Sequence, residues 1–198
     1  MTEKREIVKQ PNNILRKIAK PLETKDIVSA NTYKLIENMK ETLCNTPDGV
    51  GLAAPQIGES LRIFIVSEEA KEIDKIEKKR WEEVGGEPKR SPEKPYEEKK
   101  WKYHVFINPE VKKISKKKLE GPEGCLSVPE KFGLVKRAEK ITIQYLDETG
   151  KKFTRGFSNF FARVIQHELD HLNGALFIDK AEKILESSLR DKIVKEEK

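Results

Sequence analysis

Apolar residues recur at helical spacing in the first quarter of the chain. Ile36, Met39 and Leu43 follow one another at intervals of three and four residues, in a segment that begins at Thr24. This spacing predicts a helix with one buried face. The helix is expected to end before the Pro-Asp-Gly sequence at 47–49, because these residues are typical of a turn.

Short runs of β-branched and aromatic residues follow. They predict strands at 62–66, 103–107, 111–119, 141–146 and 151–157. Residues 147–150 have the composition of a hairpin turn.

The two ends of the chain have different patterns. Residues 1–24 contain two prolines around a short apolar group, which predicts a turn and an extended segment over the core. The last 20 residues have a helical pattern, which predicts a C-terminal helix. Its apolar stripe comprises Ile184, Leu185, Leu189 and Ile193.

A highly charged segment separates the first two predicted strands. Residues 67–102 contain eleven basic and eleven acidic residues and three prolines. Ile73, Ile76 and Trp81 permit a short surface helix at about 68–83, and the glycines and prolines after it favour an extended loop. We therefore expect one domain over 1–198, with a solvated charged insertion at 67–102.

Composition narrows the class of protein. Hydrophobic residues make up 36% of the chain and charged residues 37%, and the mean hydropathy is −0.71. Two cysteines argue against a disulfide framework, and no apolar run is long enough to span a membrane. We expect a cytoplasmic protein with no membrane or DNA partner. The net charge of +6 is compatible with an RNA-rich neighbour, and the oligomeric state stays open.

The clearest chemistry lies in the sequence Gln-His-Glu-Leu-Asp-His at 166–171. On a helix His167 and His171 point the same way, so both imidazoles can bind one metal ion with Glu168 beside them. Apolar residues at helical spacing precede the motif, namely Phe160, Phe161, Val164 and Ile165. This arrangement is typical of metal-dependent hydrolases.

A catalytic metal site needs a third protein ligand and one open position. Cys125 is the candidate, because Gly121, Gly124 and Pro129 surround it. Glycines allow the backbone to approach an ion closely, and a thiolate is a strong ligand. A single cysteine is more often part of a core, but the glycine-rich context favours a ligand here.

The segment Gly49–Gly58 is small and apolar except for Gln56. Its backbone can bind an extended ligand, and the Gln56 amide can donate to a developing oxyanion. Tight packing of an alanine-rich turn would explain the same residues.

Taken together and in this order, the three segments resemble the peptide deformylase family. The matching residues are 49–56, 123–127 and 166–171, and the likeness extends from about Ile14 to Ile178, interrupted by the insertion. It implies an α+β fold in which antiparallel strands surround a central helix with the HELDH motif, with an N-terminal and a C-terminal helix. It also implies metal-dependent hydrolysis of the formyl group from N-formylmethionine at the start of new polypeptides, releasing formate.

The resemblance assigns roles to individual residues. The implied metal ligands are Cys125, His167 and His171. Glu168 would carry the proton between water and the leaving amine, and the Gln56 side chain and Leu126 backbone N–H would stabilise the oxyanion.

The resemblance also implies how substrate binds. The nascent peptide would lie along Val50, Gly51 and Gly124 by main-chain contacts, which tolerate many sequences. Val50 and Val164 would line the methionine pocket. Arg137 and Asp170 match a charged pair that either supports the histidines or pairs elsewhere.

One thiolate and two imidazoles can bind several divalent metals, namely Fe²⁺, Zn²⁺, Co²⁺ or Ni²⁺. The resemblance favours Fe²⁺ in the cell. Partners would be N-formylmethionyl nascent peptides, with a ribosome contact as an addition. A basic stripe could serve that contact or form a solvated strand face: Lys112, Lys113, Lys116, Lys117 and Lys118.

Two other functions fit parts of the sequence. A metallopeptidase would use the same helix motif but usually takes its third ligand from downstream. Residues 172–198 contain no histidine or cysteine, and Glu182 and Glu186 have no recognisable spacing. A closed structural zinc site would take Cys44 as its fourth ligand, although such sites usually have closely paired cysteines.

Overall fold

The computed structural model describes residues 2–46, 49–73 and 102–186, and its strands form two antiparallel sheets. The five-stranded sheet has the order β1 (Gly51–Ala53), β2 (Ile63–Ser67), β3 (Tyr103–Ile114), β6 (Lys140–Leu146) and β7 (Lys152–Ser158). The three-stranded sheet has the order β4 (Lys118–Cys125), β5 (Val128–Ala138) and β8 (Lys183–Glu186). The predicted mixed helical and antiparallel class is confirmed.

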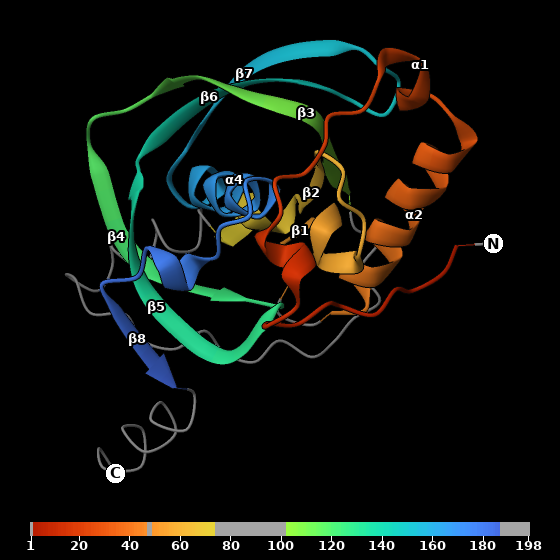
Figure 1. Ribbon diagram of the computed structural model, residues 1–198. Coiled ribbons are helices and arrows are strands. Elements are labelled where there is room, and N and C mark those ends of the chain that lie inside the picture. The colour runs from red at the N-terminus through yellow and green to blue at the C-terminus, as the bar shows by residue number, and fades with distance from the viewer. Residues whose placement is uncertain (1, 47–48, 74–101, 187–198) are drawn as a thin grey trace.

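Helix α4 (Asn159–Leu172) carries the sequence His-Glu-Leu-Asp-His. Its apolar side packs against the five-stranded sheet in one core cluster, which contains Phe161, Val164, Ile165, Leu169 and Leu172 from the helix and Phe64, Phe106 and Ile143 from the sheet. In Figure 1 the helix is seen nearly end-on, with β3, β6 and β7 on one side and β4 and β5 on another. The helix therefore contacts the core with one side and leaves another for its polar residues.

Helices α1 (Thr24–Ile27) and α2 (Ala30–Cys44) replace the single helix expected from Thr24 onward. The helical conformation is interrupted before α2, whose N-cap is Ser29. The Ser29 hydroxyl caps α2 by accepting a hydrogen bond from the Thr32 N–H at 3.2 Å. The predicted buried face is confirmed, since Ile36, Met39 and Leu43 are at most 2% exposed. They pack with β1 and β2 in a second core cluster.

The N-terminal segment is extended, as predicted, apart from the short 3₁₀ helix Asn13–Arg16. Its backbone N–H groups at Val8 and Gln10 donate to the carbonyls of Gln56 and Ser127, at 2.8 and 2.9 Å. The segment thus joins the 3₁₀ helix after β1 (Ala54–Ile57) to the turn between β4 and β5.

Two predictions about strands and helices were wrong, and one strand was missed. Residues 111–119 are not one strand, because β3 ends at Ile114 and β4 begins at Lys118. Strand β5 was not predicted. Residues 183–186 belong to strand β8, which pairs with β5, and not to a C-terminal helix.

Some predictions fall wholly or partly outside the described residues. Of the surface helix at about 68–83, residues 69–73 are helical, and the rest lies outside the described ranges. The same holds for the predicted C-terminal helix beyond 186. Within the part of the chain that the structure describes, none of the helices is long and apolar enough to cross a membrane.

Candidate metal and catalytic site

Cys125, His167 and His171 meet although the cysteine and the first histidine are 42 positions apart in the sequence. Their candidate ligand atoms all lie within 4.8 Å of one another, and Cys125 Sγ is 3.2 Å from His171 Nε2. The cysteine ends β4, and both histidines lie on α4 with ring centroids 5.0 Å apart. The predicted ligands are therefore brought together.

Cys44 is not a member of this group, which among the described residues comprises three ligand side chains. It is the last residue of α2 and contacts Tyr103 instead. The geometry gives no support to a four-ligand structural zinc site.

A buried carboxylate supports His167 from behind. Glu123 Oε2 lies 3.0 Å from His167 Nδ1, which leaves Nε2 of this imidazole for the ligand cluster. Arg137 donates to both Glu123 oxygens at 2.8 Å, and Arg163 donates to Oε1 at 2.9 Å. Burial alone raises the pKa of Glu123, but hydrogen bonds from Arg137 and His167 outweigh it and hold the pKa at about 2.

The charged network continues from Arg137 to the motif helix. Arg137 Nη1 donates to Asp170 Oδ2 at 2.6 Å, and Lys180 pairs with the other oxygen of Asp170. Arg137 is 4% exposed and Asp170 is 8% exposed. The sequence left open whether Arg137 and Asp170 support the histidines or pair elsewhere. In the structure they pair with each other behind the histidines.

Glu168 lies in a very different environment. It is 3% exposed, and its Oε2 atom has no hydrogen-bond partner among the described residues. Burial raises the pKa of Glu168 to about 7. A carboxyl group with a pKa near neutrality can both accept and release a proton.

The backbone at Gly51 allows this carboxylate to lie against β1. A Cβ atom at this position would be 2.5 Å from Glu168 Oε1 and 3.0 Å from Val164 Cγ1. Any larger residue would therefore displace Glu168 or Val164.

Gln56 is fixed with its amide toward the cysteine. Its Oε1 accepts the Ala53 N–H at 2.8 Å, which orients the side chain in the short 3₁₀ helix Ala54–Ile57. Its Nε2 lies 3.6 Å from Cys125 Sγ and 3.3 Å from Ser127 Oγ. An amide N–H donor thus lies beside the ligand cluster, where sequence reasoning expected it.

The polar atoms of the site show whether its chemistry fits a metal ion. His171 Nδ1 and Glu168 Oε2 are buried without partners among the described residues, while His171 Nε2 and the Cys125 thiol face each other. Burial lowers the pKa of His171 well below its usual value, which favours the neutral imidazole that metals bind. One sulfur and two imidazole nitrogens suit a divalent transition metal.

Known proteins resemble this chain over most of its length. A family model of polypeptide deformylases matches residues 4–186. The chain belongs to the polypeptide deformylase family. It is 38% identical over 181 residues to the peptide deformylase of Pseudothermotoga lettingae, covering 91% of this chain and 85% of the relative.

Solved deformylases have the same fold. The Met-Ala-Ser-bound class I type b peptide deformylase of Acinetobacter baumannii is 34% identical, with a TM-score of 0.72 over 91% of this chain and 99% of that one. The enzyme of Thermotoga maritima is also 34% identical, with a TM-score of 0.69 over 91% of this chain and 99% of that one. The chain is therefore a hydrolase that removes the formyl group from N-terminal formylmethionine of nascent polypeptides. Deformylase membership also decides against the metallopeptidase alternative.

The remaining residues that the deformylase resemblance singled out lie around this centre. Val50 directly precedes β1 and packs on the same core cluster as Val164. Gly124 precedes the cysteine, and a Cβ there would be 2.9 Å from Phe132 Cε1. Leu126 follows the cysteine and packs against the second core cluster.

Sequence reasoning gave no role to Glu123 or Arg163 in this deformylase. Glu123 belongs to a matching segment, so its position beside Cys125 was a usable signal. Arg163 had no such signal, because its contacts to Glu123, Leu119 and Val135 depend on how β4, β5 and α4 pack.

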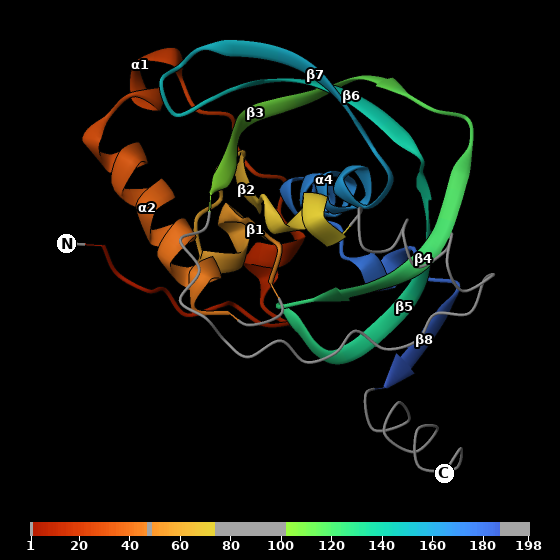
Figure 2. The same cartoon turned by 180° about the vertical axis from the view of Figure 1, so that it is seen from behind.

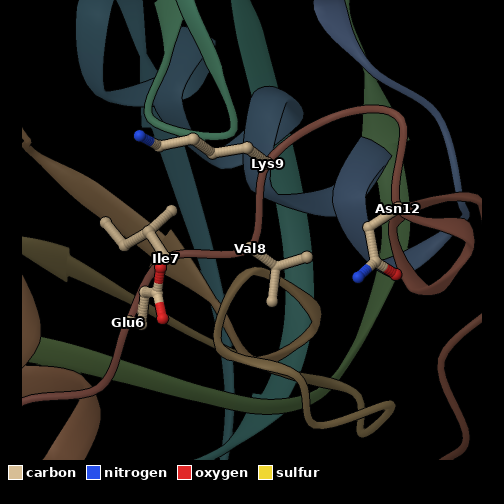
Figure 3. A pocket seen from close by; sticks show the side chains of 5 residues that line it. All are labelled: Glu6, Ile7, Val8, Lys9 and Asn12. Atoms are coloured by element: carbon tan, nitrogen blue, oxygen red, sulfur yellow. The ribbon is translucent and has the colours of Figure 1, made fainter.

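The structure also has a cavity of about 300 Å³ along the N-terminal segment (Figure 3). Its described lining residues are Glu6, Ile7, Val8, Lys9 and Asn12. None of them is a predicted site residue of the deformylase.

Proposed function

We propose that Cys125, His167 and His171 bind one divalent metal ion and that Glu168 moves the proton in deformylation. The observation that carries this proposal is the approach of Cys125 Sγ to His171 Nε2 at 3.2 Å beside a buried glutamate with an unpaired oxygen. The metal used in the cell is Fe²⁺, and Zn²⁺, Co²⁺ or Ni²⁺ can occupy the same ligands. When bound, such an ion lowers the pKa of a water molecule and polarises a carbonyl group.

Glu168 accepts a proton from the attacking water at its carboxylate and donates it to the departing amine. Its pKa of about 7 and its burial support this role, since both transfers then cost little free energy near neutral pH. Glu123, held as an anion by two arginines, fixes His167 and takes no part in the proton transfer.

The Gln56 amide and the Leu126 backbone N–H donate hydrogen bonds to the formyl oxygen as it gains charge. The Ala53 N–H holds Gln56 before substrate arrives, so the donor needs little reorganisation during the reaction. Loss of one such donor typically costs about 3 kcal/mol of transition-state stabilisation.

The peptide binds in an extended conformation between the edges of the two sheets. Strand β1 is at one edge of the five-stranded sheet and β4 at one edge of the three-stranded sheet, so both offer unpaired backbone groups. Val50, Gly51 and Gly124 belong to these edges, and Val164 lines the methionine pocket. The Acinetobacter baumannii relative was solved with Met-Ala-Ser bound, which supports a short N-terminal peptide as ligand.

The domain organisation and the cellular location are part of the same proposal. Residues 1–198 form one catalytic domain, with 67–102 as an insertion and with antiparallel strands around the helix that carries the HELDH motif. The enzyme acts in the cytoplasm and contacts the ribosome, where nascent polypeptides are made.

Formate release tests the proposal. Anaerobically prepared protein is given formyl-Met-Ala-Ser, and formate and bound metal are measured together. We expect turnover by the wild type and near-complete loss in Glu168→Ala with the metal content unchanged. Full activity of Glu168→Ala would exclude the role given to this residue.

A further inference from the structure

Positive charge is concentrated in one short segment. Residues 111–119 contain five lysines and no acidic residue, while the whole chain has a net charge of only +6. The remaining 189 residues therefore carry a net charge of about +1. A charge this localised produces a directed positive potential rather than a general one.

The segment forms a protruding corner between the two sheets. It comprises the end of β3 and the start of β4, and apart from half-buried Ser115 its residues are exposed. Figures 1 and 2 show the β3–β4 connection at the outer rim, away from α4 in both views. We call residues 111–119 the lysine corner.

Hydrogen bonds fix the backbone of the lysine corner. Ser115 donates its N–H to the Lys140 carbonyl at 2.9 Å, and its hydroxyl donates to the Lys117 carbonyl at 2.8 Å. The Glu139 N–H donates to the Lys117 carbonyl at 2.9 Å. The lysines thus extend from an ordered backbone, which lowers the entropic cost of binding a ligand.

Three of the five lysines are available for a partner. Lys112 pairs with Glu110 at 2.7 Å, and Lys117 pairs with Glu139 at 2.8 Å. Lys113, Lys116 and Lys118 form no ion pair with any residue that the structure describes. Their charges are not neutralised within the described part of the protein.

The same corner has an open backbone edge. Strand β2 pairs with β3 only as far as Ile107, and β4 is an edge strand. Val111, Ile114 and Leu119 are 50%, 59% and 36% exposed there. Backbone N–H groups, ammonium groups and exposed aliphatic side chains together match the phosphates and sugars of a nucleic acid backbone.

We propose that the lysine corner binds the phosphate backbone of RNA. The site is separate from the chemistry, because Lys118 and Cys125 are at opposite ends of β4, roughly 23 Å apart at about 3.3 Å per residue. The inference rests on the ribosome contact of the proposed function and deepens it: it assigns that contact to a surface, the lysine corner, that takes no part in formyl removal.

Fluorescence anisotropy with a labelled single-stranded RNA of mixed sequence tests this proposal. The test variant is Lys113→Gln, Lys116→Gln, Lys118→Gln in the metal-loaded protein. The matched control, Lys17→Gln, Lys20→Gln, Lys34→Gln, removes the same charge from exposed positions elsewhere. We expect about a tenfold decrease of RNA affinity in the test variant, and a salt slope smaller by about 2, since each phosphate that a lysine neutralises contributes about 0.7.

Several outcomes would overturn the proposal. Equal weakening in both variants would mean that only net charge matters. No RNA binding by the wild type would leave the lysines as protection of an open sheet edge. Binding to phosphatidylserine vesicles but not to RNA would assign the corner to a membrane surface.

Activity is measured separately on the same samples. Both triple variants should release formate from formyl-Met-Ala-Ser at the wild-type rate, since neither set of lysines belongs to the catalytic site. Failure of deformylation in the wild type would contradict the proposed function and leave the RNA comparison valid.

Discussion

Glu123 and Glu168 are both buried beside His167, at 6% and 3% exposure, yet their environments are opposite. Glu123 accepts hydrogen bonds from Arg137 and Arg163 and contacts His167. Glu168 leaves one oxygen without a partner among the described residues. Consequently the pKa of Glu123 is about 2 and that of Glu168 is about 7, although burial raises the pKa of both.

The difference separates two roles. A carboxylate with several cationic partners stays charged and can orient a metal ligand, but it is a poor base. A carboxyl group without such partners is costly to keep charged, and this cost brings its pKa into the range useful for proton transfer. The comparison predicts that loss of Glu168 affects activity and loss of Glu123 affects stability and metal affinity.

The largest expected effect is on turnover of Glu168→Gln. Glutamine has nearly the same shape but cannot accept the proton, so formate release should fall about 10³-fold. The free energy of unfolding, measured by urea denaturation, should not decrease, because a neutral amide is easier to bury than a carboxylate. A Glu168→Gln variant that keeps its activity and loses stability would contradict the roles given to Glu168 and Glu123.

A smaller effect is expected from Gly51→Ala. The added Cβ would lie 2.5 Å from Glu168 Oε1, so the carboxylate must move, and kcat should fall up to about 100-fold. Gly156→Ala is the matched control, because its nearest contact would be Thr142 Oγ1 at 3.7 Å. An equal decrease in both variants would show that strand stability, and not the position of Glu168, is responsible.

Glu123→Gln should mainly affect folding and metal binding. Removing the anion leaves Arg137 and Arg163 without their shared carboxylate, which should cost about 3 kcal/mol of unfolding free energy. The metal dissociation constant, measured by competition with a chelator, should rise about 10- to 100-fold because His167 is less well oriented. Unchanged metal affinity would remove the positioning role of Glu123.

The smallest effect is expected at the exposed end of the network. The side chain of Lys180 is 45% exposed, and its pairing with Asp170 is screened by solvent. Lys180→Met should therefore cost only about 0.5 kcal/mol and leave formate release unchanged. A large decrease of activity would mean that Asp170 depends on Lys180 more than on Arg137.

The sequence predicts the centre of the site well and its surroundings poorly. His167, Glu168 and His171 are neighbours on one helix, so local periodicity is sufficient to place them together. Glu123 and Arg163 have their roles only because β4, β5 and α4 pack against each other, and one sequence contains no direct signal for such contacts.

The errors in the fold have similar physical causes. Strand β5 contains Pro129 and several charged residues, which hide its alternation. Residues 183–186 carry apolar residues that fit a helix, but pairing with β5 makes them a strand, because tertiary context overrides local propensity. The break between α1 and α2 was missed because the apolar spacing of the second helix alone does not fix where the first turn ends.

X-ray absorption spectroscopy of the zinc-loaded protein tests the central claim most directly. We predict one sulfur scatterer at about 2.3 Å and two imidazole nitrogens at about 2.0–2.1 Å, with an oxygen in the remaining position. The sulfur should disappear in Cys125→Ser and persist in Cys44→Ser. A sulfur-free shell, or one with two sulfurs, would contradict a catalytic centre built from Cys125, His167 and His171.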